Sequence, residues 1–297
     1  MKGSGSVRET YAGKWFNVIV HLILLLAAIS CLIPLINIIA VSFSDSAAID
    51  SGFVWLWPIH FNLEAYKTLF LGSRVIPSFL NSLQITLGGT FLSLLCTTLA
   101  SYALSRKYCY GRKFITLAMV FTMMFSGGLI PFFLLMKSLG LINTYWSLWL
   151  PGLVGAYNLL IMRTHFEGIP VEIEESARID GCGEWRLLVQ IVLPLSMPVI
   201  ATICLFLAVG YWNSFLNVLI FINDAEKMNL TVFVQQMVQS QSMLMQTIAL
   251  QPEDLNNMSP EAVKAGGIVI MTLPMLIVYP ILQKYFVKGV MLGAIKG

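Results

Sequence analysis

The sequence predicts an all-α membrane protein with six transmembrane helices. Hydrophobic residues make up 57% of the chain and charged residues only 11%, well under half the charged share of an ordinary soluble domain. Apolar stretches occur at the length that a bilayer-crossing helix needs, which is about 20 residues. Lysine and arginine are concentrated in alternate connecting segments. The predicted spans cover residues 15–43, 79–104, 114–136, 148–162, 197–222 and 265–287.

The first apolar run, 15–43, begins after a short basic segment. It is much longer than the hydrophobic region of a secretory signal peptide, so we expect a retained first span in a single transmembrane domain, 1–297. Six crossings put both termini on one side. The lysines and arginines place the termini, the loop after span two and the segment 163–196 in the cytoplasm. Only these cations fall in the opposite set of segments: Lys67, Arg74, Lys137, Lys227 and Lys264.

Spans two and three contain residues that allow helices to bend or to approach closely. Glycines are paired at Gly88 and Gly89 in span two and at Gly127 and Gly128 in span three, where Pro131 follows. Glycine permits close helix packing and proline removes a helix hydrogen bond. We therefore expect kinked and tightly packed helices, which suits a moving transporter and a static bundle equally.

Uncharged polar side chains, rather than ionised ones, characterise the interior of the spans. Every Asp, Glu, Lys and Arg can be placed in a loop or at a span end, which argues against ion coupling and for an external energy source. Amides and aromatic rings suit a path for a neutral, hydroxyl-rich solute such as a sugar. The alternative is that they join neighbouring helices. The candidate path residues are Tyr157, Asn158, Tyr211, Trp212, Asn213 and Asn217.

The segment 163–196 is a charge-dense stretch between spans four and five. Pro170 suits the first turn of a helix, and Glu174 and Glu175 suit the positive end of its dipole. Gly181 supplies a turn, after which a second amphipathic stretch continues to Pro194. Two short helices meeting at a glycine form a blunt knob that could seat in the cleft of a soluble partner. An amphipathic hairpin lying at the membrane interface is the alternative.

The segment 223–264, between spans five and six, is long and rich in Gln, Met, Asn and Ser. Such a loop is usually functional or disordered. The five cysteines show no metal-ligand spacing, so we expect neither a metal site nor disulfides.

The pattern Glu175, Ser176, Ala177, then Gly181, then Ile191, Leu193 and Pro194 resembles the EAA loop of the permease subunits of bacterial ABC importers. The resemblance extends along much of the chain. Residues 81–82, 103–106 and 289–297 are similar to the carbohydrate-uptake branch, including the smaller maltose-transporter permease. Residues 127–131, 158–163 and 210–213 resemble a subgroup associated with complex oligosaccharides or polysaccharide fragments.

The resemblance implies a type I ABC importer permease fold with a cytoplasmic coupling helix, in the bacterial inner membrane. The implied protein partners are a second, homologous permease, two ATPase subunits and an extracytoplasmic solute-binding protein. Segment 223–264 would contact the solute-binding protein. Membrane lipid surrounds the spans, and nucleic acid is not an expected partner. It also implies that the tail touches the ATPase at Gly293, Lys296 and Gly297. The residues implied to couple to the ATPase are Glu174, Glu175, Ser176, Ala177, Asp180, Gly181, Ile191, Leu193 and Pro194.

The implied activity is ATP-driven import of an oligosaccharide or polysaccharide fragment by alternating access. The resemblance also implies that the chain is not an enzyme, because in this family the partner ATPases hydrolyse ATP. Consistent with that, no Gly-rich phosphate loop ending in Gly-Lys-Ser or Gly-Lys-Thr occurs in the sequence. No cofactor is expected in this chain, since ATP and Mg²⁺ would bind to the partner ATPases. Two rivals stay open at this point: an ion-coupled secondary carrier, and a non-transporting membrane scaffold for a cytoplasmic ATPase.

Overall fold

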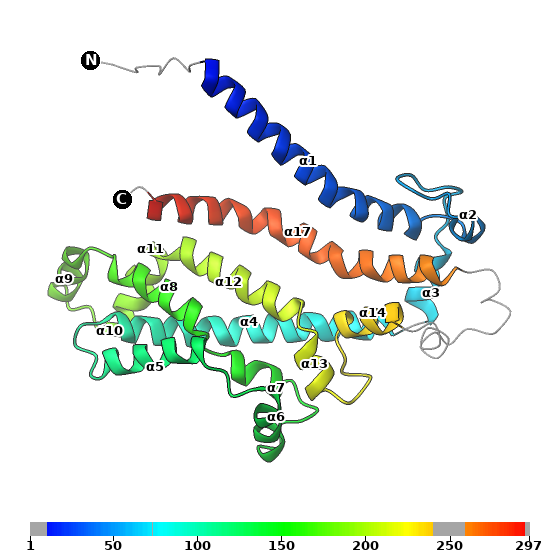
Figure 1. Ribbon diagram of the computed structural model, residues 1–297. Coiled ribbons are helices and arrows are strands. Elements are labelled where there is room, and N and C mark those ends of the chain that lie inside the picture. Colours follow the sequence, from blue (N-terminus) through cyan, green and yellow to red (C-terminus); the bar gives the residue numbers. More distant parts are fainter. Residues whose placement is uncertain (1–10, 73, 240–258, 295–297) are drawn as a thin grey trace. The chain divides into compact units, whose positions relative to one another are not determined.

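The computed structural model describes residues 11–72, 74–239 and 259–294. Helices and turns account for the regular structure of these residues, as the sequence predicts (Figure 1). The chain divides into two compact units, of which one combines 1–73 with 244–269 and the other combines 74–243 with 270–297. The long helix α17 (Pro260–Ala294) contributes to both units.

The first unit contains α1 (Tyr11–Ser42), α2 (Ser46–Asp50), α3 (Glu64–Gly72) and the start of α17. Most side chains of α1 are exposed, as expected for a helix that faces lipid or another subunit. Polar contacts join the carboxyl end of α1 and the segments that follow it. Asn37 Nδ2 donates to the carbonyl of Trp55 (2.7 Å), and Ser259 Oγ donates to Asp50 Oδ1 (3.0 Å).

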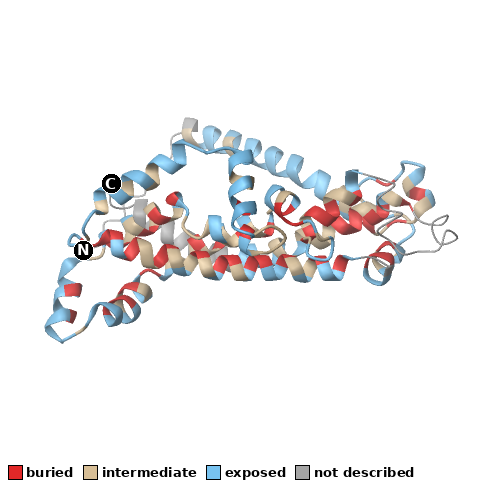
Figure 2. Ribbon diagram, turned by 90° about the horizontal axis from the view of Figure 1, so that it is seen from below, coloured by how far each residue is buried: buried red, intermediate tan, exposed pale blue. Residues whose placement is uncertain are grey.

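The second unit is built around α4 (Val75–Ser105), which packs against α8 (Ala156–Glu167) and α12 (Met197–Trp212). Its buried residues include many Ser, Thr and Gly, which let neighbouring helices approach closely. Some helices carry buried residues along their length, such as α4, and others are exposed over most of it, such as α1 (Figure 2). At one end α4 meets α9 (Val171–Ile179), and at the other it meets α14 (Leu230–Gln239) (Figure 1).

Within the described part of the chain, three unbroken helical segments have the length and composition of membrane spans, at residues 13–42, 75–105 and 260–280. Two further candidates are bent pairs. In the first, α5 (Arg112–Met124) meets α6 (Leu129–Ser138) at 119°. The break within the predicted span 114–136 begins at Phe125, whose extended backbone ends α5, and Gly128, with φ 84°, directly precedes α6, which contains Pro131.

The second bent pair joins residues 184–195 to α12 at 82°. The remaining predicted span, 148–162, is divided in the structure into α7 (Trp146–Trp149), a 3-10 turn (Leu150–Gly152) and α8. Pro151 lacks an N–H and Gly155 is extended, which explains the division. α8 alone would rise only about 18 Å, so the number of membrane crossings stays a prediction.

Two elements differ locally from the predicted boundaries. The predicted span 197–222 is interrupted at residues 213–215, and α13 (Leu216–Phe221) follows the break. The predicted outer loop 223–264 contains α14, whose buried residues include Leu230, Phe233 and Met237. α14 is amphipathic, and the mainly polar composition of the surrounding segment hides this short helical pattern. Residues 240–258 of that loop lie outside the described part of the chain.

Candidate functional site

The predicted pair of short helices is present and meets at Gly181. α9 ends at Ile179, and α10 (Glu184–Leu187) continues through a π-helical turn (Leu188–Val192) and α11 (Leu193–Leu195). Gly181 has φ 77°, its N–H donates to the carbonyl of Arg178 (3.0 Å), and Cys182 N–H donates to that of Ala177 (2.9 Å). This is a Schellman cap, in which glycine takes the left-handed position at least cost. We call residues 171–195 the hairpin.

The inner face of the hairpin is held by apolar packing. Ala177, Leu187 and Leu188 are buried in one cluster with Met162 and Phe166 of α8. Because residues from both arms enter this cluster, both arms are fixed to the helices beneath them.

The outer face of the hairpin remains uncovered in this chain. Ile179 is 86% exposed and Trp185 is 71% exposed. Glu175 and Asp180 are exposed beside them. Large apolar side chains interspersed with carboxylates are typical of a surface that another protein covers.

Glu174 behaves differently from its neighbour Glu175. Its carboxylate is buried and forms an ion pair with Arg106, which lies directly after α4; their side chains are 11% and 8% exposed. Arg106 also stacks over the ring of Tyr102, 4.2 Å from its centroid. Burial lowers the pKa of Arg106, but the hydrogen bond to Glu174 and the nearby acidic groups raise it overall, so the guanidinium stays charged.

The second arm of the hairpin has its own polar anchor at Glu184. Tyr102 Oη donates to Glu184 Oε2 (2.7 Å), and Arg178 Nη2 donates to Glu184 Oε1 (2.9 Å). Burial acts to raise the pKa of Glu184, but hydrogen bonds from Tyr102 and Tyr108 and the two nearby arginines lower it overall. Glu184 is therefore a carboxylate at neutral pH.

A hollow of about 320 Å³ lies in the middle of the second unit. Among the described residues, the lining consists of aromatic, apolar and uncharged polar groups, and the phenol of Tyr211 is its one ionisable side chain. Such a lining offers flat apolar faces and hydrogen bonds without fixed charge. The lining residues are Phe132, Ser147, Leu148, Pro151, Gly152, Phe206, Leu207, Gly210, Tyr211, Ser214 and Asn217.

Tyr211 is positioned in the wall of this hollow by two glycines and a serine. Its Oη lies 2.8 Å from Ser93 Oγ, and Ser93 Oγ also lies 3.1 Å from the carbonyl of Gly152. A β-carbon on Gly89 would come within 2.7 Å of the tyrosine ring, and one on Gly152 within 2.7 Å of its hydroxyl. Glycine at both positions therefore makes room for Tyr211, in agreement with the close approach expected for Gly89.

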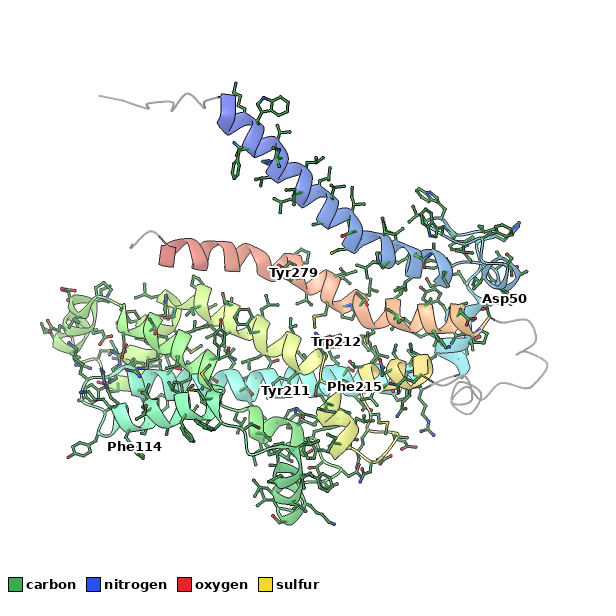
Figure 3. The ribbon with its side chains drawn as sticks, viewed as in Figure 1. Asp50, Phe114, Tyr211, Trp212, Phe215 and Tyr279 are labelled. Atoms are coloured by element: carbon green, nitrogen blue, oxygen red, sulfur yellow. The ribbon has the colours of Figure 1, made fainter. Side chains whose placement is uncertain are left out.

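Trp212, the next residue in α12, has a structural role (Figure 3). It is buried, donates from Nε1 to the carbonyl of Met271 (3.1 Å), and packs edge-on against Phe79. Asn213 is exposed and donates to the carbonyl of Val209, in its own helix (3.0 Å). Neither residue lines the hollow.

Of the remaining predicted residues, Asn217 lines the hollow, whereas Tyr157 is exposed and its ring lies 6.4 Å from that of Phe206, which lines it. Asn158 is half-buried. In the hairpin, Ser176 and Pro194 are exposed and Ile191 and Leu193 are half-buried. Gly293 falls in the last turns of α17, and Lys296 and Gly297 lie outside the described residues.

Sequence reasoning missed the groups that fix the hairpin and most of the lining of the hollow. The sequence places Arg106 on the cytoplasmic side and in a family-like run, but its partner Glu174 lies 68 residues away, so the ion pair leaves no local signal. Ser93 carries no periodic signal, since single serines are common in packed membrane helices.

These features define the chain as a membrane component of a transport system that works with other subunits. It belongs to the family of binding-protein-dependent transport system inner membrane components, whose profile matches residues 10–292.

Known relatives make the class more specific. The polygalacturonan/rhamnogalacturonan transport system permease protein YtcP of Bacillus subtilis (strain 168) is 40% identical over 287 residues, covering 96% of this chain and 99% of the relative. The galactooligosaccharides transport system permease protein GanQ of the same organism is 31% identical, covering 93% and 94%. A crystal structure of a bacterial ABC transporter involved in the import of the acidic polysaccharide alginate contains a similar chain, with 31% identity, a TM-score of 0.86 and coverage of 93% and 98%.

The chain is thus a permease subunit of an ABC importer and not itself an enzyme. Family membership favours the importer over the ion-coupled carrier and the scaffold. Among the described residues there is no group of three or more His, Cys, Asp or Glu that could hold a metal ion.

Proposed function

We propose that this subunit carries an oligosaccharide or a polysaccharide fragment across the cytoplasmic membrane, driven by partner ATPases that seat on the hairpin. A second, homologous permease completes the path, and an extracytoplasmic solute-binding protein delivers the sugar. In this proposal ATP binding draws the hairpins of the two permeases together, and the helices move between inward-facing and outward-facing arrangements.

The proposed docking of the ATPases on the hairpin is supported by the difference between its two faces. Its inner face is fixed in a buried cluster on α8 and α12. Its outer face offers Glu175, Ile179, Asp180 and Trp185 to a partner. A rigid element that is anchored on one side and uncovered on the other transmits force better than a loose loop.

The substrate class is supported by the chemistry of the hollow and by the relatives. Tyr211 and Phe206 offer ring faces, and Ser214 and Asn217 offer hydrogen bonds, and the part of the lining that the structure describes contains no lysine, arginine, aspartate or glutamate. Sugars bind to such mixed surfaces through hydroxyl hydrogen bonds and apolar ring contacts. Both relatives named above are sugar permeases: the one for galactooligosaccharides handles neutral sugars, in line with this lining, whereas polygalacturonan carries carboxylates, which the described lining does not neutralise.

Removal of the amide at Asn217 tests the sugar path. Asn217→Ala is expected to raise the KM for uptake about three- to tenfold, since a lost hydrogen bond to a neutral ligand costs about 0.5–1.5 kcal/mol. Asn213→Ala is the matched control, because Asn213 bonds within its own helix and does not line the hollow. The measurement is sugar uptake by proteoliposomes with the complete transporter. Equal KM values for the wild type and Asn217→Ala would remove Asn217 from the path.

The proposed orientation places the hairpin in the cytoplasm and residues 223–229 outside. Two exposed positions, Ile179 and Ala225, represent these sides. In a variant without the native cysteines, produced without the ATPase subunits so that nothing covers the hairpin, Ile179→Cys should react with a membrane-impermeant thiol reagent in inside-out vesicles, and Ala225→Cys should react in spheroplasts. Labelling of Ile179→Cys from outside would contradict the docking of cytoplasmic ATPases on the hairpin.

A further inference from the structure

We infer that Arg106 and Tyr102, at the carboxyl end of α4, are positioning residues that hold both arms of the hairpin and pass its displacement to the wall of the hollow. This inference rests on the proposed function, and it assigns a transmission role to residues that face neither the sugar nor the uncovered face of the hairpin.

The first step is that the two anchors lie on opposite sides of the bend. Arg106 binds Glu174, which precedes Gly181, and Tyr102 binds Glu184, which follows it. A single anchor would let the other arm swing about the left-handed glycine. Two anchors on one helix end oblige α4 to follow when the hairpin as a whole is pulled.

The second step is that the two anchors form one unit. The guanidinium of Arg106 lies over the ring of Tyr102, and Arg178, from the first arm, reaches across to Glu184 on the second. Burial of an ion pair adds little net stability, because desolvation offsets the attraction. Moreover, Nε and Nη2 of Arg106 are buried without a hydrogen-bond partner among the described residues. Fold stability alone therefore gives a weak reason for placing an arginine here.

The third step is that α4 reaches the hollow. Gly89 and Ser93, on the same helix, form the socket of Tyr211. From residue 89 to residue 106 an α-helix rises about 26 Å. No residue in Val75–Ser105 interrupts α4, so it can move as a rod between the hairpin and Tyr211.

The test uses the complete transporter in proteoliposomes and measures the amount of sugar imported per ATP hydrolysed. Arg106→Gln and Glu174→Gln are expected to keep the ATPases bound in co-purification but to lower this ratio about tenfold. A tenfold loss is of the size found when residues that couple two sites are substituted. Tyr102→Phe removes a single hydroxyl and should lower it about threefold. The double reversal Arg106→Glu with Glu174→Arg should recover most of the loss caused by either reversal alone.

The matched control is Arg163→Gln, which removes an ion pair with Glu167 within α8 and leaves Glu167 its second partner, Arg112. It should leave the ratio unchanged. A merely structural role for Arg106 and Glu174 predicts less assembled complex with a normal ratio, and that result would overturn the inference. If the Arg106 and Glu174 variants fail to assemble, the Tyr102→Phe complex is the test instead. An unchanged ratio of sugar imported to ATP hydrolysed in that complex would overturn the inference. An inactive wild-type complex would instead reject the proposed function, and the inference with it.

Discussion

Gly181→Asp is expected to abolish coupled sugar uptake while leaving the protein inserted in the membrane. Gly181 is exposed, has φ 77°, and has open space where a β-carbon would be added. The substitution therefore causes only the modest strain of a non-glycine residue in the left-handed region, about 1 kcal/mol. The larger effect arises on docking, where a new carboxylate at the tip of the hairpin would be desolvated against the ATPase at a cost of about 2 kcal/mol or more. Both uptake and sugar-stimulated ATP hydrolysis should fall at least about thirtyfold.

Gly140→Asp is a closely matched control for the backbone effect. Gly140 closes α6 with the same cap: its N–H donates to Lys137 O (3.0 Å), and Leu141 N–H donates to Met136 O (3.0 Å). It has φ 67° and the same open space. Because it lies outside the hairpin, Gly140→Asp should retain most of the uptake. Equal losses in the two variants would show that strain, rather than docking, causes the Gly181 effect.

The bend of the hairpin was predictable because its signals are local. Pro170, Gly181 and the carboxylates of the first turn define the start and the end of α9 within a dozen residues, and the structure has these features where the sequence placed them. The predicted roles within the hairpin are less uniform than the motif suggests. Glu174 and Glu175 are adjacent, yet one is buried against Arg106 and the other is exposed. That distinction depends on the position of α4, about which local sequence gives no information.

Apolar length predicted the helices α1, α4 and α17 well and the bent segments poorly. A hydropathy pattern is insensitive to a change of direction, so residues 114–136 read as one span although the chain turns by more than a right angle between α5 and α6. The hollow was equally hard to predict. Residues in consecutive positions of α12, such as Tyr211 and Trp212, point to different neighbours, and the composition of the pair cannot show which of them lines a cavity.

Trp212→Ala is expected to reduce the amount of folded transporter, in contrast to a substitution at the adjacent Tyr211. Trp212 is 3% exposed, and its indole connects α12 to Phe79 and to the carbonyl of Met271. Truncation leaves a cavity and costs about 3 kcal/mol. The measurement is the thermal unfolding of the purified complex in detergent, together with sugar uptake per correctly assembled complex. The unfolding temperature should fall by several degrees, while the KM for sugar stays close to that of the wild type.

Tyr211→Phe should give the opposite result. It retains the ring that lines the hollow and removes the hydroxyl that Ser93 holds, at a cost of only about 1 kcal/mol. With its hydroxyl gone, the ring is less firmly fixed between Gly89 and Gly152, so the KM should rise about threefold while the unfolding temperature changes little. A Trp212→Ala complex with normal stability and a raised KM would place Trp212 on the sugar path, as the sequence first suggested. The pair of measurements therefore distinguishes a residue that binds sugar from one that holds α12 against its neighbours.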